Sequence, residues 1–303
     1  MKKKIVVLMG GISKERKISL LTGKACVKSI KKNHKVYVID PQINFIDKLR
    51  KIKPDIVFNA LHGKYGEDGF VQSILEQEKI KYTHSGVLPS SIAIDKELSK
   101  LIFIEKKILT PKYIIYSNDE KFSIIEKINN SKIKFPVVIK PINEGSSLGV
   151  FICTKKNIIK KKKYLKNYNK ILVEEYIPGR EIQVGIMGKK ALGAIELKPK
   201  RKFYDYYAKY SNKAKTKHIM PAPLEKKKYN EVLNIAKKVH KIIGCKGITR
   251  SDFRYYKGKF YLLEINTQPG MTKFSLIPEM AAFQGLEFDK IIKWIIDDAS
   301  ILR

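Results

Sequence analysis

Short apolar runs alternate with longer segments of mixed polarity over roughly the first ninety positions of this chain. The short runs predict strands in the segments 4–10, 35–40, 54–61 and 81–86. A helix is predicted between the first two strands, from about residue 19 to residue 31. A chain that alternates strands and helices is expected to form a parallel sheet, with ligand groups at the carboxyl ends of the strands. Those ends carry Gly10–Gly11 and Leu61-His62-Gly63.

The pattern changes in the remaining two thirds of the chain. Residues 90–107 predict one helix whose apolar face is interrupted by Ser99 and Lys100. Strands and helices then mix up to about residue 178, after which the predicted strands are mostly antiparallel, with helices at 225–243 and from about 286. We expect an α/β lobe with a Rossmann-like parallel sheet, followed by two α+β lobes. The expected domains are 1–92, 93–178 and 179–303.

The net charge of +33 would normally point to a nucleic-acid partner. The chain, however, has only seven arginines against 55 lysines, and the lysines are spread along its whole length. Proteins that bind bases and phosphates favour arginine because its planar group makes paired hydrogen bonds. We therefore interpret the charge as AT-biased coding drift and expect no specific nucleic-acid partner, although anionic polymers should bind non-specifically.

The chain shows no sign of export or membrane insertion. The apolar run at residues 5–9 is too short for a signal peptide and is interpreted as the first strand. No run approaches the roughly 18 apolar residues that a membrane span needs. Cys26, Cys153 and Cys245 form neither a metal-binding spacing nor a disulfide framework, which favours a reducing cytoplasm.

Two predicted strands near the C-terminus carry the strongest local signal. Arg250 and Asp252 lie two apart on one strand, and Glu264 and Asn266 lie two apart on the next. If the strands pair across Lys257-Gly258, these side chains meet on one face of the sheet. Carboxylate and amide oxygens are hard ligands that suit Mg²⁺ bridging phosphates, and Arg250 suits an anion. The alternative is an exposed ladder of salt bridges.

Two further segments allow more than one interpretation. KPINEGSSLGV (140–150) could be a strand connection, a serine nucleophile on a turn, or a cradle of backbone N–H groups for phosphate beside Lys140. VEEYIPGREIQV (173–184) could be a charged hairpin, or its edge carboxylates could hold adenine and ribose. The chain lacks the common glycine-rich nucleotide fingerprints and the HExxH zinc motif.

Several segments, taken in order, resemble the D-alanine–D-alanine ligases of the ATP-grasp superfamily. They cover nearly the whole chain, and as an ordered set they are highly specific. The matching stretches are GGISKERKISL (10–20), ALHGKYGEDG (60–69), DKELSK (95–100), VVIKPINEGSSLGV (137–150), VEEYIPGREIQV (173–184), FYDYYAKY (203–210), GITRSDF (247–253) and LLEINTQPGMTKFSL (262–276).

The resemblance implies an ATP-grasp fold in which the two α+β lobes enclose ATP. It also implies a reaction in which the carboxylate of one D-alanine takes the γ-phosphate of ATP, and the amine of a second D-alanine attacks the resulting acyl phosphate. The dipeptide would serve peptidoglycan precursor synthesis. The implied cofactors are ATP and two Mg²⁺ or Mn²⁺ ions, and the implied assembly is a homodimer.

The family's site residues carry over position by position. Asp252, Glu264 and Asn266 resemble the metal ligands, and Arg250 with the Gly270 N–H resembles the oxyanion contacts. The ATP contacts are implied to be Lys96, Lys140, Ser147, Glu174, Tyr176, Ile177, Glu181 and Lys209. The resemblance implies that Glu15 and His62 contact the first D-alanine. It implies that Ser275 and Leu276 contact the second. Glu15, Ser146 and Tyr210 resemble a hydrogen-bonded triad that joins three distant parts of the chain.

The presence of Tyr210 favours D-alanine over D-lactate as the second substrate, because family members that make the depsipeptide usually lack this tyrosine. Gln268 and Lys273-Phe274 depart from common family forms without removing a catalytic side chain. One rival hypothesis is another ATP-grasp ligase with a different amino acid. The other is a basic nucleic-acid-binding protein, which predicts arginine-rich stripes that the sequence does not contain.

Overall fold

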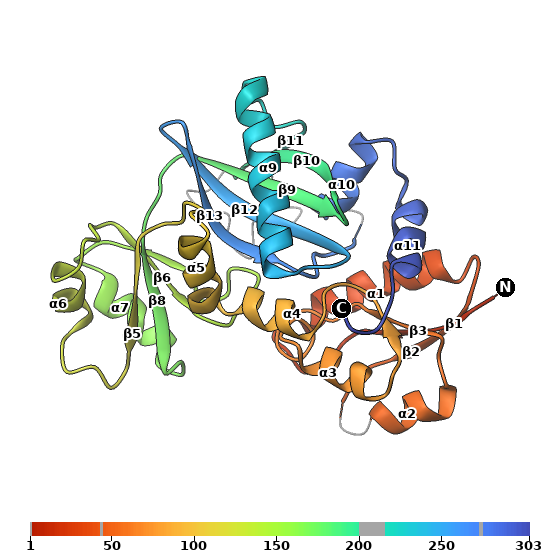
Figure 1. The fold of residues 1–303 in the computed structure, drawn as a ribbon. Helices are drawn as coiled ribbons and strands as arrows, with labels where there is room; N and C mark the ends of the chain where they lie inside the picture. Colours follow the sequence, from red (N-terminus) through yellow and green to blue (C-terminus); the bar gives the residue numbers. More distant parts are fainter. Residues whose placement is uncertain (1, 43–44, 200–215, 273–274) are drawn as a thin grey trace.

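The computed structural model describes residues 2–42, 45–199, 216–272 and 275–303, which form three sheets with their helices (Figure 1). The N-terminal sheet has the order β2-β1-β3-β4 and is parallel throughout, as predicted. Its strands are β1 (Lys4–Leu8), β2 (Lys35–Ile39), β3 (Ile56–Asn59) and β4 (Lys81–Tyr82). Its helices are α1 (Arg16–Ile30), α2 (Phe45–Ile52), α3 (Phe70–Gln77) and α4 (Val87–Ile94).

The prediction of a single helix over residues 90–107 is wrong. Helix α4 ends at Ile94, and a second helix, α5 (Lys96–Glu105), begins after Asp95. Asp95 has an extended backbone, and its carboxylate accepts hydrogen bonds from the N–H groups of Glu97 and Leu98 at 2.9 and 3.0 Å. Aspartate favours this capping position, so it starts a new helix where the apolar pattern alone continued the old one.

The central sheet is antiparallel, with the order β5-β8-β6-β7. A loop of residues 142–150 joins β6 to β7, and Leu165 packs under the sheet with Ile139 and Val173. The elements of this part are β5 (Tyr113–Ser117), α6 (Ile124–Asn129), β6 (Val137–Pro141), β7 (Phe151–Cys153), α7 (Ile158–Lys162), η1 (Lys163–Leu165) and β8 (Lys170–Glu175).

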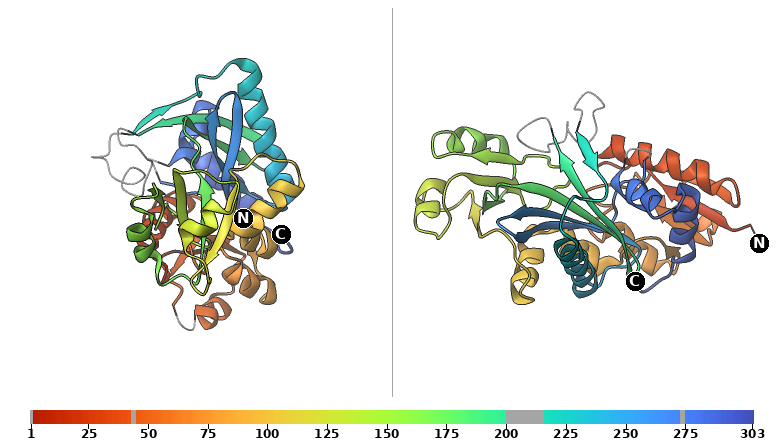
Figure 2. Two further views of the ribbon diagram at one scale, coloured as in Figure 1. Left: turned by 90° about the vertical axis from the view of Figure 1, so that its left-hand side faces the viewer. Right: turned by 90° about the horizontal axis from the view of Figure 1, so that it is seen from above.

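The C-terminal sheet has five antiparallel strands in the order β11-β10-β9-β12-β13. Helix α9 (Lys226–Ile243) covers one face through Val232, Ala236 and Val239 (Figure 2). The strands are β9 (Arg180–Met187), β10 (Lys190–Lys198), β11 (Lys217–Ile219), β12 (Ile248–Tyr256) and β13 (Lys259–Asn266).

Two C-terminal helices tie this sheet to the N-terminal one. Helix α10 (Leu276–Phe283), which the sequence pattern did not predict, and α11 (Phe288–Asp297) follow β13. Ile277 of α10 and Ile292 of α11 share one buried core with Val7 of β1 and Ile195 of β10. Segments from both ends of the chain therefore form a common base, from which the central sheet extends to one side (Figure 1).

Among the described residues, no helix combines the length and apolar character that crossing a bilayer requires. The three cysteines are buried and unpaired. Burial raises the pKa of Cys153 to about 11 and that of Cys245 to about 12, so both thiols stay protonated at neutral pH.

Candidate active site

The two strands that carry the strongest sequence signal form a hairpin. Arg250 pairs with Asn266 and Asp252 with Glu264, so the four side chains share one face of the sheet. The register shifts just beyond Asp252, where Leu263 is the extra residue of a bulge. The bulge lets Leu262 face the buried core while Leu263 and Glu264 both line a cavity.

The side chain of Asp252 is bound by a residue of its own strand, Arg250. Arg250 donates two hydrogen bonds to it, at 2.7 and 3.0 Å, and Asp252 is only 4% exposed. Glu264 is the more open carboxylate, with the Lys96 ammonium 3.7 Å away, and Asn266 accepts from the N–H of Gln268 at 2.8 Å. This arrangement differs from an exposed salt-bridge ladder, because Asp252 is buried and its ion pair with Arg250 lies within one strand.

The donor set fits a magnesium ion that also binds phosphate. Within the part of the chain that the structure describes, no cluster of three or more His, Cys, Asp or Glu side chains could hold a metal by itself. Asp252 and Glu264 supply two carboxylates and Asn266 supplies one amide. Magnesium is commonly held by one or two carboxylates together with phosphate oxygens, so two carboxylates and one amide suffice.

A buried group of three charges lies next to this hairpin. The Lys140 ammonium donates to one oxygen of Glu174 at 2.5 Å, and the Lys100 ammonium lies 2.9 Å from the other. Burial works against the charge on Glu174, but the charges and hydrogen bonds of both lysines outweigh it and lower the pKa of the carboxyl group. Burial lowers the pKa of Lys100 to about 8, although Glu174 opposes that shift.

Lys96 is a third buried lysine on the same side. Its ammonium donates to the Glu144 carbonyl at 2.6 Å, and its backbone N–H donates to the Ile142 carbonyl at 3.2 Å. Burial lowers the pKa of Lys96, partly opposed by the charge of Glu264. Because Asp95 ends helix α4, the first turn of α5 places this lysine against the loop that follows β6.

Several of these groups line one cavity between the central and C-terminal sheets. Its volume is about 70 Å³. Arg254, which was not predicted, also lines this cavity. It donates to the Gly179 carbonyl at 3.0 Å and lies 3.8 Å from Glu181. The cavity brings together most of the predicted nucleotide and metal residues, namely Lys96, Lys140, Ser147, Glu174, Tyr176, Ile177, Glu181, Asp252 and Glu264.

Glu15 lies where two loops meet the start of helix α1. That helix begins three residues earlier than predicted, which makes Glu15 its N-cap. Glu15 is buried, and the hydroxyl group of Ser146 donates to its carboxylate across 131 positions of sequence. A Cβ atom at Gly63 or Gly145 would lie 2.5 or 2.8 Å from the Glu15 Oε2 atom, so both loops need glycine to come this close.

The loop that carries Ser146 has an uncommon backbone. Ser146 and Ser147 both have positive φ angles, 50° and 58°, a region that residues other than glycine rarely adopt. Such conformations concentrate at functional sites, where the surrounding structure holds them in place. Here they let the short loop reach two partners, since Ser146 contacts Glu15 and Glu144 accepts from Lys96.

His62 lies close to Glu15 and makes two buried contacts. Its Nδ1 atom is 3.0 Å from Glu67 and its Nε2 atom is 3.1 Å from the Thr22 hydroxyl group. Burial opposes protonation of His62, but the hydrogen bond and charge of Glu67, together with the charge of Glu15, outweigh it and raise the pKa of the ring. Neither Glu67 nor Thr22 was predicted, although Glu67 follows His62 in the same turn-rich segment.

Thr22 also lies near Gly270, in the segment that precedes helix α10. A Cβ atom at Gly270 would lie 3.9 Å from the Thr22 hydroxyl oxygen and 3.2 Å from that of Ser275. Ser275 is the N-cap of α10, its Oγ accepts from the Thr272 N–H at 2.9 Å, and Leu276 is the first residue of that helix. Gly270 therefore lies between Ser275 and Thr22, the partner of His62. Lys209 and Tyr210 lie outside the described residues.

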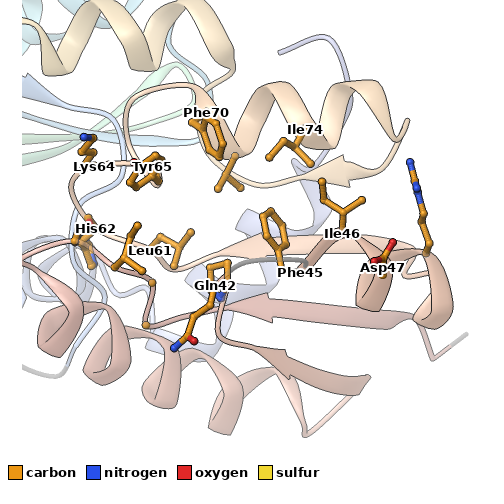
Figure 3. Close-up of a pocket in the computed structure, with 17 residues that line it drawn as sticks. Gln42, Phe45, Ile46, Asp47, Leu61, His62, Lys64, Tyr65, Phe70 and Ile74 are labelled. Atoms are coloured by element: carbon orange, nitrogen blue, oxygen red, sulfur yellow. Dashed lines mark hydrogen bonds between the residues drawn. The ribbon is translucent and has the colours of Figure 1, made fainter.

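A second, larger cavity of about 690 Å³ lies in the N-terminal part of the chain (Figure 3). His62 lies at one end and Asp47 at the other, with Phe45, Phe70 and Ile74 between them. Its lining is mostly apolar, so the buried charges that phosphate chemistry requires are in the smaller cavity. Size alone would have selected a cavity that contains only one of the predicted site residues, His62.

Comparisons with known proteins give one consistent result. The family model described as "D-ala D-ala ligase C-terminus" matches residues 104–297. The chain is 60% identical over 304 residues to a D-alanine–D-alanine ligase of Pelagibacter ubique, with 100% of each chain covered. A second such ligase, from Wolbachia pipientis, is 45% identical over 97% of this chain and 94% of its own.

A solved structure agrees with these relatives. The D-alanine–D-alanine ligase of Bacillus anthracis complexed with ATP has a TM-score of 0.82 at 30% identity, and the match covers 98% of this chain and 97% of that one. The predicted ATP-grasp fold is thereby confirmed.

Proposed function

This chain belongs to the D-alanine–D-alanine ligase family, and we propose that it joins two D-alanine molecules with consumption of ATP. The reaction passes through D-alanyl phosphate, releases ADP and phosphate, and supplies a peptidoglycan precursor. One observation supports this proposal best. Glu15 and Ser146 converge from two distant parts of the chain beside a cavity with buried lysines and paired carboxylates.

The smaller cavity is the proposed nucleotide site. Lys96 and Lys140 supply positive charge for the phosphate groups, together with Lys209 and the backbone near Ser147. Glu174, Tyr176 and Ile177 surround the adenine, and Glu181 holds the ribose. Asp252, Glu264 and Asn266 would hold two Mg²⁺ or Mn²⁺ ions. When bound, these ions neutralise negative charge on the phosphate groups.

The contacts around Glu15 form the proposed site of the first D-alanine. Glu15 accepts from the ammonium group of the substrate, with His62 beside it, and Ser146 and Tyr210 complete the triad. Arg250 and the Gly270 N–H stabilise the oxyanion that forms when the second D-alanine attacks. Ser275 and Leu276 hold that second D-alanine. Because the two substrates meet at a buried site, water is kept from the acyl phosphate.

We also propose that the domains are 1–92, 93–178 and 179–303. The protein is further proposed to be a cytoplasmic homodimer without a specific nucleic-acid partner. The extents of the sheets support the first two ranges. The N-terminal sheet ends at Tyr82, and the central sheet lies within residues 113–175. A sedimentation experiment on the purified protein tests the dimer, and a salt titration of DNA binding tests the nucleic-acid prediction.

Release of phosphate from ATP tests the proposed reaction. We expect release that requires D-alanine and Mg²⁺, with D-alanyl-D-alanine as the product, and no release with L-alanine. Phosphate release driven equally by L-alanine or by another amino acid would refute the substrate assignment. It would favour a different ATP-grasp ligase with the same nucleotide site.

A further inference from the structure

Lys100 belongs to the buried charge group, yet the proposed reaction gives it no part. Glu174 on β8 lies between Lys140 on β6 and Lys100 on α5, at 2.5 and 2.9 Å. All three side chains are buried, Lys100 completely. Two cations thus share one carboxylate, although one of them would suffice to balance its charge.

The two lysines differ in what else they can reach. Lys140 lines the smaller cavity, whereas Lys100 does not. The Lys100 ammonium donates to the Thr110 hydroxyl group at 2.6 Å, and that hydroxyl donates to the Leu262 carbonyl at 2.8 Å. The ring of Tyr113 lies 5.4 Å from the same ammonium. Lys100 is therefore fixed behind Glu174, away from any ligand in the cavity.

Nucleotide binding must change this arrangement. Ligand pockets usually have volumes of about 300–1,000 Å³, and the cavity measures about 70 Å³. Side chains that cross it have to move, and the phosphate groups of a nucleotide attract Lys140. A buried carboxylate that lost its only counter-charge would take up a proton and stop acting as a charged acceptor.

We propose that Lys100 is a positioning residue for nucleotide recognition. It keeps Glu174 charged and correctly oriented while Lys140 leaves that carboxylate for the phosphate groups of ATP. Glu174 then accepts a hydrogen bond from the amino group of adenine. This inference rests on the proposed function, because it takes Glu174 to be the residue that contacts the base.

Substitution Lys100→Met removes the charge and keeps most of the side-chain volume. We expect the Kd and KM for ATP to rise about tenfold or more, since a hydrogen bond to a charged group is lost or weakened. The kcat and the KM for D-alanine should change little. ITP carries a carbonyl group in place of the amino group, so the preference for ATP over ITP should fall by a similar factor. Lys106→Met is the matched control, because Lys106 is exposed at the end of the same helix.

A second pair of variants separates this role from a general loss of stability. In a Glu174→Gln background the charge to be balanced is absent, so adding Lys100→Met should not weaken ATP binding further. If Lys100→Met does not fold, Thr110→Val keeps the Lys100 charge and removes the hydroxyl group that joins Lys100 to the Leu262 carbonyl. It should raise the Kd for ATP and lower the ATP preference to a smaller extent.

Different results would refute the proposed function and the proposed role of Lys100. A wild-type protein without D-alanine-dependent phosphate release would refute the proposed function. A wild-type protein that is active, with Lys100→Met and Thr110→Val leaving the Kd for ATP and the ATP preference unchanged, would refute only the role of Lys100. Equal losses for ATP and ITP would also refute that role, because they would indicate a structural effect that does not involve the base.

Discussion

Gly145→Ala tests whether the contact between Glu15 and the loop after β6 positions the first D-alanine. The backbone at Gly145 does not have a positive φ angle, so alanine meets no backbone penalty there. Its Cβ atom would lie 2.8 Å from Glu15 Oε2 and 3.4 Å from the carboxyl carbon. To reach an ordinary contact of 3.4 Å, the carboxylate oxygen or the loop must move by about 0.6 Å.

A displacement of this size matters because Glu15 is proposed to hold the ammonium group of the substrate. A misplacement of about 1 Å can cost about 100-fold in rate, so we expect kcat/KM for the first D-alanine to fall about 10- to 100-fold. Overpacking should cost about 1–3 kcal/mol of stability at most. The KM for ATP should stay within about twofold, since Gly145 does not line the nucleotide cavity.

The assay is phosphate release at saturating ATP with D-alanine varied, together with a thermal unfolding curve. Gly258→Ala is the control, because that glycine faces open space in the turn between β12 and β13 and should affect stability alone. An unchanged kcat/KM for D-alanine in a folded Gly145→Ala protein would show that the position of Glu15 does not govern substrate binding. A matching rise in the KM for ATP would show that the loop acts on the nucleotide instead.

Three further outcomes are expected. Asp252→Ala should abolish turnover in a folded protein by removing a proposed metal ligand, and near-wild-type turnover at saturating Mg²⁺ would contradict that assignment. Glu67→Gln should lower the pKa of His62, as measured by NMR titration. Because the pKa of His62 is raised in the folded state, its protonation stabilises the protein fully below the unfolded pKa of about 6.5. That stabilisation is lost as pH rises through the folded pKa, so the stability difference between wild type and Glu67→Gln should shrink at alkaline pH in urea titrations. Finally, the buried cysteines should not react with a thiol reagent at pH 8 in the native state and should react after unfolding, which a colorimetric thiol count would show.

Local pattern was sufficient where neighbouring residues decide the structure. The alternation of strands and helices predicted the parallel N-terminal sheet, and two polar residues on each of two adjacent strands predicted the hairpin with Arg250 and Asp252 opposite Asn266 and Glu264. Local pattern failed where one side chain overrode it. The capping carboxylate of Asp95 split a helix that the apolar residues alone would have continued.

The contacts within the buried charge group could not be predicted from the pattern of residues along the chain. Lys100 was visible in the sequence as an interruption of an apolar helix face, which is the signal that could have identified it. Its partner Glu174 belongs to a strand more than seventy positions away, and only the packing of α5 against the central sheet brings them within 2.9 Å. Arg254 likewise shares a strand face with Asp252, but its approach to Glu181 depends on the pairing of β12 with β9.

The sequence by itself determined the strands, most of the helices and, through its ordered motifs, the family, because periodicity and short spacings act along the chain. The tertiary structure decided which distant side chains share a charge, which loops need glycine, and that Ser146 meets Glu15 across 131 positions. Those contacts depend on how three sheets pack together, and the energy of a buried charge depends on every group around it. No stretch of sequence carries that information alone.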